Sequence, residues 1–384
     1  SFDVLKAENA RLQAAVKSRT IELEIETALE RVRTEAMGMK KPDDILAICK
    51  VMFTELQSLG FSELRNTLIN FWDDESSSLI DYDYSNDTGG NKANLSYSSH
   101  PVFEQFQKTI KNSEDAFAEL VVTRSELESW KQRRRDSGEY EDPRLNNIPA
   151  LYYYFYSIAV GAIGISTFSP ITEEQLNVLK RFRNVFDFAY RRYADVAQAE
   201  AQAKEAQIEL ALERVRARTM AMQHSNELPD AATILFQQVQ SLGMPAWSAG
   251  YCTWNDDKSA VTLWMSSEGV LQPAFTAPTT EDELFIQMRK GQEDGKTFHV
   301  VEMGGDQLVK HYGYMRTLPL MGDILDSIIA AGHPSPTFQI MHHAYFSKGF
   351  LLFITYEPVP DAHDIFKRFA KVFEQTYTRF LDLQ

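Results

Sequence analysis

The residues with the most reactive side chains are two cysteines and eight histidines. Cys49 and Cys252 fall in a predicted helix and a predicted strand, so they form neither a zinc-binding CxxC pair nor a disulfide framework, which favours a reducing compartment. Five histidines of the second half attract attention as metal ligands: His299, His311, His333, His342 and His343. Neighbouring residues of a strand point to opposite faces, so His342 and His343 cannot both bind one ion without distortion. We predict structural histidines and no metal site.

The residue pattern contains no recognisable catalytic motif. The glycine pairs Gly89-Gly90 and Gly304-Gly305 match neither GxGxxG nor a P-loop, so no phosphate-binding loop is predicted. No nucleophile has a recognisable base partner. We therefore predict no catalytic residues and no enzyme activity.

Aromatic residues give the better hypothesis for a ligand site, because tyrosine, tryptophan and histidine combine an apolar body with a polar tip. In the first half, residues two apart on predicted strands share a face; in the second half a comparable set occurs. The candidate ligand-binding residues are Tyr82, Tyr84, Tyr152, Tyr154, Trp247, Tyr251, Trp264 and His343. The alternative is that these aromatic stripes are plain core. The arginines of KQRRRD, 133–135, could meet an anionic ligand, but a charge run beside acidic neighbours is usually solvated.

The net charge and the hydropathy of the chain limit the classes of partner that it can bind. The 384 residues carry a formal net charge of −15, which gives the wrong long-range field for a phosphate backbone or an anionic lipid surface. The longest apolar run, 151–165, is interrupted by Ser157 and is shorter than the roughly 18 residues of a spanning helix. We expect no nucleic-acid partner, no membrane insertion and a cytoplasmic location. The chain opens SFDVLKAEN without a signal peptide, and we expect it to be part of a longer protein.

An internal repeat organises the chain. The segment IETALERVRTEAMGM at 25–39 recurs as IELALERVRARTMAM at 208–222, and the same shift carries one QSLG onto another. LKRFRNVFDFAYRRYADV at 179–196 resembles FKRFAKVFEQTYTRFLDL at 366–383. The middles of the copies agree poorly. Each copy therefore runs helix, globular module, helix, and we expect both modules to share one topology.

A long helix should join the two modules. Neither glycine nor proline occurs between Pro170 and Pro229, and Thr172 and Gln175 form a capping-box pattern at its start. We predict one continuous helix from about Thr172 to Met222.

Apolar residues near heptad spacing on this helix and on the N-terminal helix predict a partner helix, although packing onto the adjacent module is the alternative. We place the stripe outside both cores and expect a parallel homodimer. Its predicted interface residues are Leu5, Leu12, Leu23, Leu29, Val32, Ile208, Leu212, Val215 and Met222.

Each module is predicted to have a central antiparallel sheet with helices on one face, an α+β fold. Strands are expected at 64–72 and 79–84, and at 247–254 and 260–265, with two closing strands in each copy. Helical segments are expected at 101–111 and 281–290. The predicted layout is an N-terminal helix at 1–41, a first module at 42–193, a connecting helix at 172–223 that shares the first module's last helix, and a second module at 224–384.

The order of these elements, in tandem with a connecting helix, resembles tandem GAF domains, with PAS as the nearest competitor. The text ALERVRARTMAM followed by QSLG resembles linkers in multi-domain sensor histidine kinases, or related signalling regulators, of Bacteroidetes-type bacteria. The resemblance implies a sensory region of a two-component system. Cofactors are unknown: neither an NKxxF-type lysine motif for cyclic nucleotides nor a bilin-binding cysteine segment is present. Two hypotheses remain open, a small-molecule sensor that signals through dimeric helices, or a degenerate scaffold that binds nothing and only spaces other domains.

Overall fold

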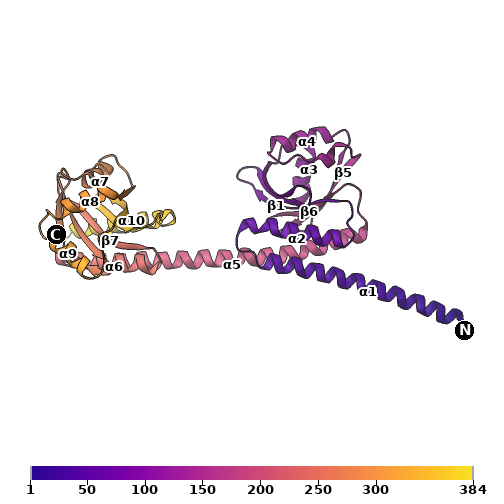
Figure 1. Ribbon diagram of the computed structural model, residues 1–384, viewed down its shortest axis with the longest axis horizontal. Helices are drawn as coiled ribbons and strands as arrows, with labels where there is room; N and C mark the ends of the chain where they lie inside the picture. Colours follow the sequence, from indigo (N-terminus) through magenta and orange to yellow (C-terminus); the bar gives the residue numbers. More distant parts are fainter. Residues whose placement is uncertain (1, 383–384) are drawn as a thin grey trace. The chain divides into compact units, whose positions relative to one another are not determined.

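The computed structural model describes residues 2–382 and shows an α+β chain with two antiparallel sheets and a long helix (Figure 1). The chain divides into two compact units, one running to Ala199 and the other beginning at Glu200. The division falls within α5 (Glu173–Met220), so the predicted continuous helix is confirmed. Thr172 and Gln175 exchange the two hydrogen bonds of a capping box at its start, at 2.9 and 3.2 Å. No helix of residues 2–382 has the length and apolar character needed to cross a membrane.

The first unit is built around a six-stranded sheet in the order β3-β2-β1-β6-β5-β4. Its strands are β1 (Leu64–Asp73), β2 (Ser78–Ser85), β3 (Gly89–Ser96), β4 (Phe117–Thr123), β5 (Ala150–Ile158) and β6 (Gly161–Thr167). Its helices, besides the first part of α5, are α1 (Phe2–Met37), α2 (Ile45–Ser58), α3 (Pro101–Ile110) and α4 (Leu127–Asp136), with short 3₁₀ turns at Pro42–Asp44 and Pro143–Asn146.

The second unit repeats this plan in the order β10-β8-β7-β13-β12-β11, with the short β9 beside β8. Its strands are β7 (Ala246–Trp254), β8 (Ala260–Ser267), β9 (Val270–Leu271), β10 (Phe275–Pro278), β11 (Phe298–Gly304), β12 (Phe338–Phe346) and β13 (Gly349–Thr355). Its helices, besides the end of α5, are α6 (Leu228–Ser241), α7 (Glu283–Glu293), α8 (Gly305–Met315), α9 (Met321–Ala330) and α10 (His363–Asp382), with 3₁₀ turns at Ser225–Glu227 and Pro360–Ala362. In each unit the first strand pairs with the last, β1 with β6 and β7 with β13, as expected for a duplication.

Each sheet is covered on both faces, which corrects the expectation of helices on one face. In the first unit α1, α2 and α5 pack on one face, while α3 and α4 cover the other (Figure 1). In the second unit the end of α5, α6 and α10 cover one face, and α7, α8 and α9 cover the other. The near-continuous burial of β6 and β13 follows from this, because a strand inside two layers buries both of its faces.

A salt-bridge clamp recurs in both units. Arg181 on α5 reaches Glu22 and Glu26 on α1, and in the second unit Arg368 on α10 reaches Glu205 and Glu209 on α5. Each clamp ties the helix that leads into a unit to the helix that leaves it. All of these residues occupy matching places in the two copies, so the duplication extends to side-chain contacts.

The apolar stripe predicted to lie outside both cores lies inside them. Leu29 and Val32 are 3% and 0% exposed in the core of the first unit. In the second unit Ile208, Leu212, Val215 and Met222 are equally buried against α6 and α10. The physical reason is that each unit covers its own leading helix, so these side chains have their partner within the chain. The remaining seam residues on α1, Leu5, Leu12 and Leu23, are exposed.

Candidate functional site

A cavity of about 90 Å³ lies in the second unit, between the sheet and helices α7, α8 and α9. Leu352 and Ile354 of β13 line its sheet side, and Phe285, Met315 and Ile324 line its helical side. Five of the chain's 12 methionines belong to the lining: Met265, Met288, Met315, Met321 and Met341. Methionine is flexible and polarizable, so these walls can adapt to the shape of an apolar guest.

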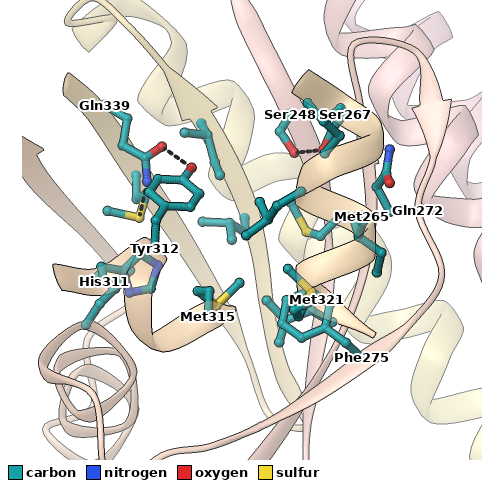
Figure 2. A pocket seen from close by; sticks show the side chains of 18 of the residues that line it. Ser248, Met265, Ser267, Gln272, Phe275, His311, Tyr312, Met315, Met321 and Gln339 are labelled. Carbon is teal, nitrogen blue, oxygen red and sulfur yellow. Dashed lines mark hydrogen bonds between the residues drawn. The ribbon is translucent and has the colours of Figure 1, made fainter. Parts of the chain in front are cut away.

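Two polar pairs lie at opposite sides of the cavity in Figure 2. Ser248 and Ser267 share a 2.9 Å hydrogen bond across β7 and β8. The hydroxyl of Tyr312 donates to Gln339 Oε1 at 2.9 Å, and Gln339 Nε2 lies 3.5 Å from the sulfur of Met341. Burial raises the pKa of Tyr312, so the hydroxyl stays neutral and remains a donor. Within each pair the two polar side chains hydrogen-bond to each other, so the rest of the lining is mainly apolar.

His311 is held at the edge of the cavity by Asp282, whose Oδ2 lies 2.9 Å from His311 Nδ1. Asp282 also caps α7 by accepting from the amide of Leu284. Burial alone would raise the pKa of Asp282, but the contact with His311 and the amides of Phe285 and Leu284 outweigh it and lower the pKa. The histidine is therefore oriented by a structural carboxylate.

One polar atom of the lining remains without a partner. Trp247 Nε1 is buried and has no hydrogen-bond acceptor among the described residues. The indole ring of Trp247 stacks on Tyr356 at 5.7 Å, which fixes its orientation. A buried donor without a partner costs about 1 to 3 kcal/mol, so an acceptor supplied by a guest molecule would be favourable here.

Of the aromatic residues predicted to bind a ligand, Trp247 lines this cavity. Tyr82, Tyr84, Tyr152 and Tyr154 instead pack in or against the core under α2 and α5. Tyr251 stacks on Trp264 at 5.0 Å and packs on Phe373 of α10, on the sheet face away from the cavity. His343 is buried on the cavity side of the sheet but outside the lining. These aromatic stripes are mostly core, because helices cover both faces of each sheet.

The sequence hypothesis missed the methionines, the serine pair and the Tyr312–Gln339 pair. A signal existed: six of the 12 methionines fall between 265 and 341. This density is high for a short region, but the helices α8 and α9, which carry Met315 and Met321, were not predicted. Without those helices, the residues had no common face.

The histidines behave as strand geometry requires. His342 contacts Thr355 at 3.0 Å and lies against Phe366 of α10, whereas His343 faces Phe350 on the other side of the sheet. Within residues 2–382, no three histidine, cysteine or carboxylate side chains come together as metal ligands. Burial lowers the pKa of His342 to about 4 and of His343 to about 3.

In the first unit, the same side of the sheet carries a smaller and charged cavity of about 30 Å³ under α3 and α4. Arg133 and Arg134, expected to be solvated, are 6% and 8% exposed and line it together with Asp81 and Glu139. The expectation failed because α4 turns this face of the KQRRRD run toward the sheet, leaving Arg135 outside.

Comparison with known proteins gives little. No protein-family model matches the chain, and no curated protein is similar to it. Among solved structures, the chain is similar to a bacteriophytochrome from the photosynthetic bacterium R. palustris, with 10% identity and a TM-score of 0.33. The match covers 86% of this chain and 62% of the bacteriophytochrome chain.

Proposed function

We propose that the chain is a non-catalytic sensory fragment whose second unit binds a small, mainly apolar molecule. The observation that supports this most directly is the methionine-lined cavity with the unpartnered Trp247 donor in its wall. Its 90 Å³ are well above the roughly 10 to 15 Å³ that a cavity needs to hold one water, which leaves room for a single small ring. A neutral ring with one hydrogen-bond acceptor fits the walls and the free donor together.

A route for the signal runs through β13. Leu352 and Ile354 line the cavity, while Phe353 between them points to the other face and stacks on Phe366 of α10 at 4.0 Å. A shift of β13 on binding would move α10 directly. The Arg368 clamp then passes the shift from α10 to α5. Such small shifts can change the position of the helices when a packed core has two discrete arrangements, because binding then favours one of them.

The element order of both units supports GAF-like modules, with the parent protein a sensor histidine kinase or related two-component regulator whose output lies outside these residues. The alternative is a scaffold that binds nothing. The core-like packing of the first-unit tyrosines argues against a tyrosine-lined pocket on that face of the first sheet. We place the fragment in the cytoplasm.

Self-association is proposed through the N-terminal part of α1, in a parallel homodimer. Leu5, Leu12 and Leu23 are 71%, 55% and 61% exposed and continue a near-heptad seam. Light scattering should show a dimer of the parent chain, and Leu5→Asp with Leu12→Asp should shift it to monomer. A monomeric parent, or a double variant that dimerises unchanged, removes the seam as the interface.

Ligand-observed NMR with benzene and pyridine tests the binding proposal, because the two rings match in size and differ in one acceptor nitrogen. Both should show saturation transfer from the protein, and pyridine should bind more tightly if its nitrogen accepts from Trp247. Met315→Trp fills the cavity and should abolish both signals.

Val309→Trp is the matched control, since Val309 is 73% exposed on the same helix α8. It should leave binding of both probes unchanged. If neither probe binds the parent chain, or if Met315→Trp binds them as well as the parent, the sensory proposal fails and the scaffold alternative stands.

A further inference from the structure

Arg133 of the first unit is a buried cation on the sheet-facing side of α4. Its side chain is 4% exposed, and the guanidinium lies 4.2 Å from the ring centre of Trp130 and 5.4 Å from that of Phe103. These aromatic contacts hold the group in place, since a cation is attracted to the face of a ring. A guanidinium fixed in this way is a preformed donor group.

The partners of Arg133 are incomplete. Its Nη2 lies 3.1 Å from Glu139, and Arg134 also pairs with the same carboxylate. Its Nε and Nη1 are buried and have no acceptor among the described residues. Buried charged donors are normally hydrogen-bonded, because leaving them unpaired costs the full desolvation of the group. Two free donors on one buried guanidinium point to an acceptor that comes from outside the chain.

The cavity that Arg133 lines has room for such an acceptor. Its 30 Å³ exceed the roughly 10 to 15 Å³ that a cavity needs to hold one water, which leaves room for an ion as small as formate or acetate. Asn70 on the opposite wall already donates from Nδ2 to Asp81 at 2.5 Å. Leu68, Leu120 and Phe155 supply an apolar remainder that suits a short hydrocarbon end.

The local charge balance favours a single negative charge. Burial, and then the charges of Asp83 and Glu139, raise the pKa of Asp81 well above its usual value, which favours the neutral form of its carboxyl. With Asp81 neutral, the charged residues that line the cavity are two cations, Arg133 and Arg134, and one anion, Glu139. One monoanion would neutralise the remaining charge, whereas a phosphate dianion would exceed it and is too large. Arg65 is already satisfied by Asp142 at 2.8 Å.

We propose that the first unit binds a small monocarboxylate in this cavity, with the carboxylate accepting from Arg133. The site is separate from the apolar cavity of the second unit and does not depend on it. The two units would then take ligands of different chemistry on corresponding faces of their sheets.

Isothermal titration calorimetry of the whole chain with sodium acetate tests this, with sodium chloride at equal ionic strength as reference. Acetate should bind at one site, and chloride should not reproduce the heat. Arg133→Met should weaken acetate binding at least about tenfold, the usual scale for a lost charge-assisted hydrogen bond. Arg135→Met, on the exposed side of the same helix, should bind acetate as the parent does.

A second variant leaves the charges intact. Leu120→Phe on the edge strand β4 fills the cavity and should also remove binding, which decides the case if Arg133→Met fails to fold. Asp81→Asn imitates the neutral carboxyl and should retain binding. No acetate binding to the parent, an equal response to chloride, or unchanged binding by the folded Arg133→Met or Leu120→Phe variant would overturn the proposal. None of these results bears on benzene or pyridine in the second unit.

Discussion

The two units share one sheet topology, but the buried side chains at matching strand positions are polar or charged in the first unit and apolar in the second. Gly161 at the start of β6 and Gly349 at the start of β13 each approach the neighbouring strand so closely that a Cβ would lie 1.7 Å from the carbonyl oxygen of Asn70, or 1.8 Å from that of Cys252. Asn70 and Cys252 are therefore equivalent positions. Across the hairpin Asn70 pairs with Asp81, whereas Cys252 pairs with Leu263.

The next equivalent positions continue the contrast, with Asp83 in the first unit and Met265 in the second. Buried carboxyls in the first unit require the arginines of α4, whereas the second unit needs only apolar helices above the same strands. The duplicated part is therefore the sheet together with its salt-bridge clamps. The cavities were set by side chains at matched positions, so topology alone does not predict what either unit binds.

The largest effect on stability is expected from disrupting the buried charge cluster of the first unit, which consists of Arg133, Arg134 and Glu139. Glu139→Gln removes the carboxylate shared by Arg133 and Arg134, and leaves two buried cations uncompensated. The free energy of unfolding of this unit should fall by about 3 to 5 kcal/mol, measured by urea denaturation. Glu141→Gln, at a side chain 79% exposed, should change it by less than about 0.5 kcal/mol. Equal effects of the two variants would mean that the cluster contributes little.

Enlarging the cavity of the second unit should cost somewhat less and change its binding. Leu263→Ala removes a side chain that is 3% exposed and lines the cavity, so this unit should lose about 2 to 4 kcal/mol. Benzene should bind the variant more tightly than the parent, and ligand-observed NMR should show it. A loss of stability without tighter binding would place Leu263 in the core but away from the guest.

Acid should affect the buried His342 and His343 of the second unit and the buried Asp81 of the first unit in opposite directions. The lowered pKa values of His342 and His343 mean that their contribution to stability is complete above 6.5 and is lost as the pH falls through about 4 and 3. The second unit should lose up to about 1.4 kcal/mol per histidine for each pH unit below 6.5. The raised pKa of Asp81 has the reverse sign: its contribution is complete below the usual carboxyl pKa and is lost as the pH rises through the raised value.

Scanning calorimetry of the whole chain at pH 7 and pH 5.5 measures this difference, with Glu139→Gln and Leu263→Ala assigning the transitions. The second-unit transition should move down at pH 5.5, and His343→Leu should reduce that movement. A first-unit transition that falls in parallel would contradict the assignment of opposite signs.

The smallest effects are expected at the two clamps, and they should be alike. Arg181→Ala and Arg368→Ala each remove a partly exposed guanidinium that bridges two glutamates on the leading helix. Each variant should lose less than about 1 kcal/mol, since solvent screens such pairs. Urea denaturation of both variants provides the check. A large effect in one unit alone would show that the clamps have diverged as the cavities have.

The sequence by itself predicted the parts that repeat or have a strong local pattern. The recurrence of ALERVR and QSLG fixed the duplication, and the absence of glycine and proline after Pro170 predicted α5. Strands at 64–72, 79–84, 247–254 and 260–265 were predicted within a residue or two, because β-branched and aromatic runs bounded by turn residues are a local signal.

Only the tertiary structure decided which faces are covered and what lines the cavities. The stripe of Ile208, Leu212 and Val215 gives the same heptad pattern whether a partner chain or the chain's own α10 covers it, and burial in the second unit settled the matter. Likewise the arginines of α4 look solvated in sequence and become buried because α4 lies over the sheet, where Arg133 and Arg134 line a cavity with distant residues such as Asp81 and Phe155. Helical and strand periods are local, whereas burial and charge pairing depend on residues far apart in the chain, and these appear only when the chain has folded.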